Sequence, residues 1–226
     1  SLDHPLTAWQ QHCDRIHTSL AAFRWPQPDW SRVRQGAETL IPHYPVLRIT
    51  LFPDGQELIT GRTLPSDLWA RQQRGATAWI ADPDSSRSLP GHKTGNYLAC
   101  WLASQAAKAQ GAAEAILVDE MGNWLETSSG SLWGWAEGHW WTPPLAAGIL
   151  PGVVRSQLIC HLQARGCPAL ETPWTPDQIR RFEGLAYSNS VVQVIPIHTV
   201  LQGRTRLEYN PDQQILQELR SLFGEA

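Results

Sequence analysis

The first 68 residues contain two stretches with helical spacing, followed by two strand-like stretches. In the first stretch apolar side chains recur every three or four positions, at Leu6, Trp9, Cys13, Ile16 and Leu20. Prolines then end this helix, and Asp29 is placed to cap a second one. A strand, a tight turn and a return strand are expected at residues 46–52, 54–55 and 57–60. The pattern predicts a small α+β domain over residues 1–68.

Residues 69–226 show the pattern of a larger, β-rich domain with flanking helices. Strands are expected at residues 76–81, 115–118, 124–125, 131–135, 140–141 and 191–200. Those between 115 and 141 are separated by short turns, which indicates an antiparallel meander. Helices are expected at residues 96–110 and from Gly152 to Arg165. A third helix should start at the capping box of Thr175, and a fourth after Pro211, with Ile215, Leu219, Leu222 and Phe223 as its apolar positions. The predicted fold class is therefore α+β, with two domains at 1–68 and 69–226.

Composition narrows the class of protein and its partners. The 226 residues are 42% hydrophobic, enough for a folded core, and the net charge of −3 comes without any Lys/Arg run, so nucleic acid is not an expected partner. No apolar stretch approaches the roughly 20 residues that span a bilayer, and residues 1–5 lack signal-peptide anatomy. The four cysteines are scattered and read as reduced thiols. A cytoplasmic protein without a membrane anchor is expected.

Met121 is the only methionine, so the initiator and a preceding part of the small domain are expected to lie outside this sequence.

Three features could carry chemistry. Lys93 stands between a turn-rich run and an apolar helix, where partial desolvation would make its amine a usable nucleophile, although most lysines at helix entrances are solvated. The segment 148–154 places glycines and a proline at a helix start, where free backbone amides favour an anion such as phosphate. An ordinary glycine-proline turn is the simpler interpretation. Glu126 follows Trp124 on a strand and could face a pocket, or it could be an exposed glutamate at a strand end.

Taken together, the order and spacing of these segments resemble the class-IV aminotransferase family, which includes branched-chain and D-amino-acid aminotransferases and aminodeoxychorismate lyases. The matching segments are residues 12–16, 93–98, 111–117, 122–126, 131–133, 142–144, 148–155, 187–191 and 195–196. They cover essentially the whole chain. The resemblance implies a two-domain, fold-type-IV enzyme with pyridoxal 5'-phosphate as cofactor, a small-molecule amino substrate and a homodimeric state. The family's usual N-terminal strand segment is absent here.

The resemblance also implies roles for individual residues. Lys93 would form the imine with the cofactor aldehyde and then move the proton, and Glu126 would pair with the protonated pyridine nitrogen. Tyr97 would approach the ring hydroxyl. The cofactor phosphate would be held by Arg15, the backbone amides of Val153 and Val154, and the hydroxyl of Ser190. Substrate binding is assigned to Arg48 and Val191. Ser131 departs from the family pattern, which usually has asparagine there.

The spacing Lys93-x-x-Asn96 and the run over residues 188–191 look like aminodeoxychorismate lyase, and this activity is the favoured one. Tyr97 looks like an aminotransferase residue, so an amino-acid aminotransferase of the same family is the alternative. A different class is a tryptophan-rich binding protein, since the chain has 12 tryptophans, but Trp124, Trp133, Trp135 and Trp141 alternate along strands as core residues do. No metal site is expected, because the eight histidines show no ligand spacing.

Overall fold

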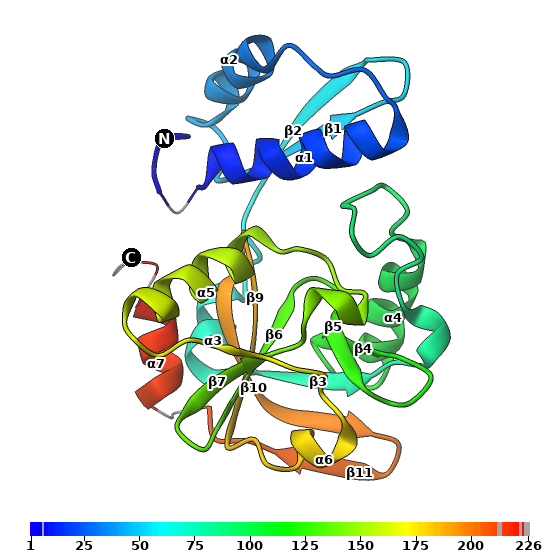
Figure 1. Ribbon diagram of the computed structural model, residues 1–226, viewed down its shortest axis with the longest axis vertical. Coiled ribbons are helices and arrows are strands. Elements are labelled where there is room, and N and C mark those ends of the chain that lie inside the picture. The colour runs from blue at the N-terminus through cyan, green and yellow to red at the C-terminus, as the bar shows by residue number, and fades with distance from the viewer. Residues whose placement is uncertain (6, 212–213, 222, 224–226) are drawn as a thin grey trace. The chain divides into compact units, whose positions relative to one another are not determined.

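The computed structural model describes residues 1–5, 7–211, 214–221 and 223. Leu6 and Leu222, which the hydrophobic pattern assigns to two helices, lie outside the described residues. The chain divides into two compact units, Ser1–Leu68 and Trp69–Ala226, and each is described by itself. The predicted α+β class is confirmed, because each unit combines helices with a β-sheet (Figure 1).

The first unit consists of two helices and a hairpin. The helices are α1 (Trp9–Phe23) and α2 (Trp30–Leu40), and the strands are β1 (Val46–Leu51) and β2 (Glu57–Arg62), which pair antiparallel. Asp29 caps α2 as expected, since its carboxylate accepts hydrogen bonds from Ser31 N at 3.0 Å and Arg32 N at 3.2 Å. Helix α2 lies on β2 so closely that a Cβ at Gly36 would come within 2.9 Å of the Ile59 side chain.

The second unit is built on one large sheet, with strand order β5-β4-β3-β10-β9-β6-β7-β8 and β11 paired to β10. Its strands are β3 (Ala76–Ile80), β4 (Glu114–Val118), β5 (Trp124–Thr127), β6 (Ser131–Ala136), β7 (His139–Thr142), β8 (Leu170–Glu171), β9 (Gly184–Asn189), β10 (Gln193–Gln202) and β11 (Thr205–Glu208). Strand β3 runs parallel to both of its neighbours, β4 and β10. The strand positions that the sequence predicts for this unit are all occupied by strands.

The predicted antiparallel meander from residue 115 to 141 is wrong. Strands β4 and β5 form one hairpin and β6 and β7 form another, but β6 pairs with β9 and not with β5. Three strands, β3, β10 and β9, separate the two hairpins in the sheet order. The short segment after Thr127 is therefore a crossing between two parts of the sheet and not a simple hairpin turn. Local periodicity identifies strands but carries no information about which distant strand becomes the neighbour.

Helices cover the sheet. They are α3 (Leu68–Arg74), α4 (Leu98–Ala109), α5 (Val153–Ala164), α6 (Pro176–Ile179) and α7 (Gln214–Ser221), with short 3-10 turns η1 (Pro83–Ser85) and η2 (Leu145–Ala147). Helix α4 packs on β3 and β4, α5 on β9, and α7 on β10 (Figure 1). Thr175 caps α6 as predicted, but the helix has only four residues. Among the described residues no helix is long and apolar enough to cross a membrane.

Most of the strand tryptophans belong to the core. Trp124, Trp133 and Trp140 are buried, and the rings of Trp133 and Trp140 meet edge to face with centroids 6.5 Å apart. Trp135 and Trp141 are half-buried. A continuous tryptophan-lined binding surface on these strands is therefore excluded. The four cysteines are free thiols, of which Cys13 and Cys100 are buried.

Candidate active site

Lys93 lies in the loop that connects η1 to α4. Two hydrogen bonds hold this loop: Asn96 Nδ2 donates to Ser88 Oγ at 2.8 Å, and Asn96 N donates to Thr94 Oγ1 at 3.3 Å. Helix α4 begins at Leu98, two residues later than expected, because Tyr97 has ψ 3° and stands at the N-cap. Lys93 is exposed in this structure.

Glu126 is buried on β5, with only 2% of its surface exposed. The alternative of a solvated glutamate at a strand end is therefore wrong. Arg87 Nε donates to Glu126 Oε1 at 2.7 Å, and Leu150 N donates to the same oxygen at 3.4 Å. Within the described part of the chain Oε2 accepts no hydrogen bond, so it is the oxygen that remains available to a ligand. Burial raises the pKa of Glu126, and the positive charge of Arg87 opposes that rise.

Arg87 is the residue that the sequence analysis missed. It belongs to the turn-rich run between β3 and α4, its side chain is 8% exposed, and its guanidinium carbon lies 5.7 Å from the centroid of the Tyr97 ring. Burial acts to lower the pKa of Arg87, but the charge of Glu126, its hydrogen bond to Arg87 and smaller effects of Cys100 and Tyr97 together more than offset this, so the pKa is raised. One feature of the sequence could have pointed to Arg87. It is the only basic residue in the turn-rich run 82–91, and it lies six positions before Lys93.

The positive charge of Lys93 acts on the carboxyl group of Glu126. Burial raises the pKa of both Cys100 and Glu126, and the positive charges of Arg87 and Lys93 act against that rise at both groups. The structure therefore brings together an amine, a guanidinium and a buried carboxylate in the second unit. The combination provides an amine, a buried carboxyl group and a cation whose charge favours the ionised form of that carboxyl group.

Tyr97 points its hydroxyl at the turn that follows β5. Its Oη donates to the carbonyl oxygen of Ser128 at 2.7 Å, and the phenol proton is thereby engaged. Tyr97 is 37% exposed, so the ring has an accessible side.

The start of α5 has the geometry of an anion site. Gly152 is the N-cap and provides no side-chain hydrogen bond to the first amides, and Val153 and Val154 are buried. A Cβ at Gly152 would lie 2.8 Å from Ser131 Oγ, so glycine and a small polar residue together leave the backbone approachable. Arg155 fixes this helix start, because its Nη2 donates to Pro143 O at 2.8 Å and to Glu171 Oε2 at 2.5 Å.

Ser190 and Val191 lie in the turn between β9 and β10. Ser190 is exposed, and Val191 N donates to Asn189 Oδ1 at 2.8 Å. Asn189 Oδ1 also accepts from Val192 N at 3.0 Å, so one side chain shapes the whole turn. The amide of Val191 is thus engaged in the turn, and its half-buried side chain is the part left to contact a ligand.

Arg15 and Arg48 belong to the first unit. Arg15 lies on α1 with Nη2 3.3 Å from His12 Nδ1, and burial lowers its pKa. Arg48 is exposed on β1, opposite Thr60 of β2. The other residues predicted to hold the cofactor all belong to the second unit, whereas Arg15 belongs to the first.

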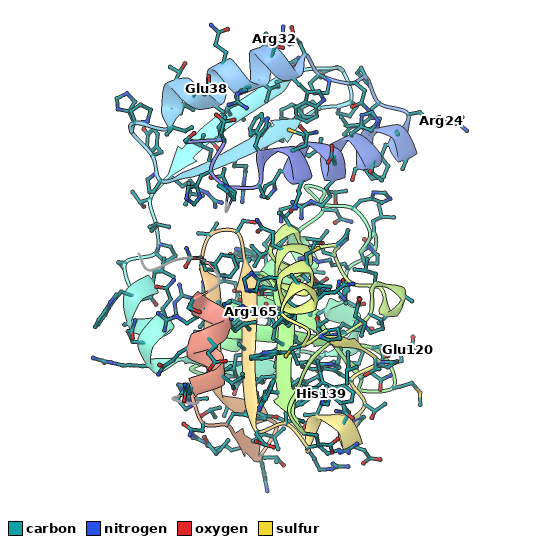
Figure 2. All side chains as sticks on the ribbon, turned by 60° about the vertical axis from the view of Figure 1, so that its left-hand side comes forward. Arg24, Arg32, Glu38, Glu120, His139 and Arg165 are labelled. Atoms are coloured by element: carbon teal, nitrogen blue, oxygen red, sulfur yellow. The ribbon has the colours of Figure 1, made fainter. Side chains whose placement is uncertain are left out.

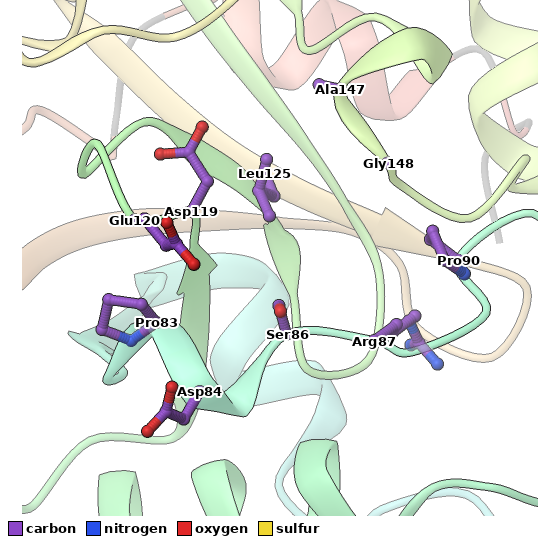
Figure 3. Close-up of a pocket in the computed structure, with 10 residues that line it drawn as sticks. All are labelled: Pro83, Asp84, Ser86, Arg87, Pro90, Asp119, Glu120, Leu125, Ala147 and Gly148. Carbon is purple, nitrogen blue, oxygen red and sulfur yellow. The ribbon is translucent and has the colours of Figure 1, made fainter.

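A pocket of about 320 Å³ lies beside Arg87 (Figure 3). Its lining includes the carboxylates of Asp84, Asp119 and Glu120, and Glu120 projects outward from the surface in Figure 2. Asp119 already accepts hydrogen bonds from the Met121 and Asn123 amides. Three acidic side chains around one basic group disfavour an anionic ligand, so this pocket does not suit a phosphate. The start of α5 does.

The donor set fits pyridoxal phosphate. The carboxylate of Glu126 is buried and has a free oxygen for a ring nitrogen, the amine of Lys93 is accessible, and the uncapped start of α5 offers amides to a phosphate. By contrast, the described part of the chain contains no group of three His, Cys, Asp or Glu side chains that could hold a metal ion.

Comparisons with known proteins point to one family. The family described as amino-transferase class IV matches residues 3–200. The aminodeoxychorismate lyase of Vibrio harveyi is 23% identical over 221 residues, which cover 90% of this chain and 82% of the relative.

Solved structures have the same fold. A hypothetical aminotransferase from Mycobacterium tuberculosis in its apo form has a TM-score of 0.81 at 20% identity, covering 96% of this chain and 82% of that one. A branched-chain aminotransferase from the archaeon Thermoproteus uzoniensis has a TM-score of 0.78 at 20% identity, covering 94% and 76%. The family match spans most of the chain and includes Lys93 and Glu126, so this chain belongs to the class-IV aminotransferase family and is a pyridoxal-phosphate-dependent enzyme.

Proposed function

We propose that this protein is a 4-amino-4-deoxychorismate lyase, which converts its substrate to 4-aminobenzoate and pyruvate. The main support is the similarity to the Vibrio harveyi lyase, which extends over 90% of this chain. The spacing Lys93-x-x-Asn96 supports the same activity, because it resembles lyases more than branched-chain enzymes. The reaction divides the atoms of one substrate between two products, so it needs no amino acceptor.

Lys93 is assigned the covalent and proton-transfer steps. Bound pyridoxal phosphate supplies an electron sink for the pair of electrons left on carbon when a proton leaves. Lys93 would hold the cofactor through its amine, and that amine would also take the proton from the carbon next to the substrate amine. The bond from Asn96 to Ser88 at 2.8 Å holds the loop that carries this amine.

Glu126 is assigned to the ring nitrogen. A carboxylate there stabilises the protonated ring and so strengthens the electron sink. The buried position of Glu126 and the free Oε2 support the assignment. Arg87 binds Oε1, and its positive charge favours the ionised carboxylate against the effect of burial, so we assign it a positioning role.

The other contacts to cofactor and substrate are assigned from the charge and hydrogen-bonding capacity of each residue. The phosphate is assigned to the amides of Val153 and Val154, the Ser190 hydroxyl and the Arg15 guanidinium, and the ring hydroxyl to Tyr97. Arg48 and Val191 are assigned to the substrate, whose carboxylates suit a basic side chain. The domain roles follow, with residues 69–226 as the cofactor-binding domain and residues 1–68 as a smaller domain that contributes basic side chains.

An amino-acid aminotransferase is the second candidate, and Tyr97 favours it. A tyrosine at this position is characteristic of branched-chain enzymes in the family, and here the phenol stands at the N-cap of α4 beside Arg87. Both activities use the same cofactor and the same amine chemistry, so only the products separate them.

A homodimer is also proposed. Leu98, Trp101 and Leu102 share one side of α4 at helical spacing, and they are 63%, 50% and 52% exposed. Three large apolar side chains in one patch are typical of a surface that another protein covers. Location in the cytoplasm is proposed from the sequence alone.

The deciding experiment is a product assay. The purified protein with pyridoxal phosphate is incubated with 4-amino-4-deoxychorismate, and 4-aminobenzoate and pyruvate are measured by chromatography. Equimolar release of both, absent in Lys93→Ala, supports the lyase. Absence of both products, with transfer of an amino group from a branched-chain or D-amino acid to 2-oxoglutarate, would replace the lyase by the aminotransferase.

A further inference from the structure

Glu114 is a carboxylate inside the sheet that none of the assigned roles uses. It is the first residue of β4, it is 4% exposed, and the four residues that follow it in the strand are apolar and buried. Burying a carboxyl group costs free energy unless its oxygens are hydrogen-bonded. An apolar side chain at this position would avoid that cost. The partners of the Glu114 carboxyl group therefore indicate which part of the structure it serves.

Two of the three hydrogen bonds to the Glu114 carboxyl group come from the turn that follows β5. Ser128 Oγ donates to Oε1 of Glu114 and Ser129 Oγ donates to Oε2. A third bond is local, from Ala115 N to Oε1 at 3.0 Å. Burial raises the pKa of Glu114, with the serine hydroxyls acting against the rise. Each carboxyl oxygen is thus tied to a different residue of the turn that follows β5.

This turn, residues 128–130, contacts the proposed site on two sides. The Ser128 carbonyl accepts the hydroxyl of Tyr97 at 2.7 Å, and the Ser129 carbonyl accepts Asn189 Nδ2 at 3.2 Å. Asn189 in turn holds the amides of Val191 and Val192 through its side-chain oxygen. Two positions assigned to the cofactor, Tyr97 and Ser190, therefore depend on where the turn lies.

The internal bonds of the turn set its shape but not its position. Thr127 Oγ1 accepts from Gly130 N at 2.9 Å, and Thr127 N donates to Gly130 O at 2.8 Å. A Cβ at Gly130 would lie 2.3 Å from Ser188 O, so the turn packs closely on β9 at this glycine. Ser128 N donates to Ala115 O of β4 at 2.8 Å, and the Glu114 carboxyl group adds a bond from β4 to each of the two serine hydroxyls.

We propose that Glu114 is a positioning residue of the active site: it fixes the turn 128–130, and through that turn it sets the positions of Tyr97 and Asn189. The proposal rests on the proposed function for the cofactor contacts of Tyr97 and Ser190. It goes beyond it, because Glu114 has no assigned contact with cofactor or substrate.

The test compares three variants of the whole chain. Glu114→Gln keeps an acceptor for Ala115 N and Ser128 Oγ and provides a donor to Ser129 Oγ, whereas Glu114→Ala removes all three bonds. Phe182→Leu is the matched control, since this ring packs on Trp174 with centroids 4.4 Å apart and its loss weakens packing alone. For each variant the dissociation constant of pyridoxal phosphate is measured by equilibrium dialysis of the apoprotein, together with Tm and the pH titration of the visible absorbance of bound cofactor.

The expected pattern separates positioning from stability. Glu114→Ala should raise the dissociation constant ~10-fold and shift the pH titration, Glu114→Gln should stay within ~2-fold of the unsubstituted protein, and Phe182→Leu should lower Tm with an unchanged dissociation constant. Equal cofactor affinity in Glu114→Ala and Phe182→Leu would overturn the proposal. So would a Glu114→Gln protein as weak as Glu114→Ala.

If Glu114→Ala does not fold, Ser128→Ala answers the same question, because it removes only the bond from the Ser128 hydroxyl to Oε1 of Glu114. A ~3-fold rise in the dissociation constant is expected, and no change overturns the proposal. The measurement uses no substrate. A protein that binds the cofactor but releases no 4-aminobenzoate would therefore contradict the lyase and leave this test intact.

Discussion

Arg87 and Glu126 form an ion pair in the interior of the second unit. Arg87 Nε donates to Glu126 Oε1 at 2.7 Å, and the two side chains are 8% and 3% exposed. Both charged groups are shielded from water, so the attraction between them must replace the hydration that each has lost. Because the bond uses one carboxyl oxygen, Glu126 can be held by Arg87 and still present Oε2 to a ligand.

Arg87→Met should destabilise the protein. The variant keeps most of the side-chain volume but leaves the Glu126 carboxylate buried without its cation, and breaking a buried pair in this way costs about 3–5 kcal/mol. Urea unfolding at neutral pH measures the loss. The double variant Arg87→Met/Glu126→Leu, which removes both charges, should recover much of it, and a single-variant loss below about 1 kcal/mol would contradict the pairing.

Glu126→Gln should keep the fold and lose activity. The amide side chain would still offer an oxygen to Arg87, but the substitution removes the charge that stabilises a protonated ring nitrogen. We expect the variant to bind pyridoxal phosphate and to lose at least ~100-fold in kcat, which corresponds to about 2.7 kcal/mol of barrier. Near-normal turnover would mean that another group holds the ring nitrogen.

The sequence predicted elements well wherever the determining interactions are local. Asp29 caps α2 and Thr175 caps α6 because each cap depends on residues within one turn of the helix. The partners of β6 were not predictable in this way. Its neighbour β9 lies about 50 residues further along the chain, and no local pattern selects it over β5.

The same limit applies to the site. Lys93 and Glu126 were predicted from the order of motifs, but Arg87, which binds Glu126, and Glu114, which binds the turn after β5, were not. Arg87 reaches Glu126 across 39 positions, and Glu114 reaches Ser128 across 14. Each was visible in the sequence only as a lone charged residue, Arg87 in a polar turn and Glu114 in an apolar strand. The partners of Glu114 become evident only when β4 and β5 are paired, and that of Arg87 only when the segment between β3 and α4 is placed against β5.

Lys93→Ala should abolish covalent attachment of the cofactor and all turnover, while the fold remains. Lys93 is exposed in a loop, so its side chain contributes little to the core. Lys93→Arg should fail as well, because a guanidinium is a weak nucleophile at neutral pH. The visible absorbance before and after borohydride treatment measures the attachment. A Lys93→Ala protein that stays yellow and active would show that Lys93 is the wrong residue.

Arg15→Ala and Ser190→Ala should weaken retention of the cofactor more than they slow the chemistry. Both side chains are assigned only to the phosphate, one as a charge and the other as a hydroxyl. Equilibrium dialysis should give a higher dissociation constant for each variant, with kcat at saturating cofactor changed less. Arg24→Ala, which removes a basic residue that projects from the surface in Figure 2, is the control. Unchanged affinity in both test variants would leave the start of α5 as the sole phosphate contact.

Glu114→Gln should change how stability depends on pH. Burial raises the pKa of Glu114 in the folded protein, while the nearby charge of Arg71 acts to lower it, and the unfolded chain has an ordinary value of about 4.3. Between these two pKa values the folded state binds more protons than the unfolded state, so stability falls as the pH rises from about 4.3 through the folded pKa. Glutamine cannot ionise and removes this contribution.

The stability of Glu114→Gln relative to the unsubstituted protein should therefore increase with pH, measured by urea unfolding of the apoprotein at about pH 5 and about pH 8. The raised pKa of Glu126 affects both proteins equally and cancels in the difference. Glu120→Gln, the same change at an exposed carboxylate, should give no such trend. A Glu114→Gln difference that is the same at both pH values would mean that the folded protein accommodates the ionised carboxylate as well as the neutral one.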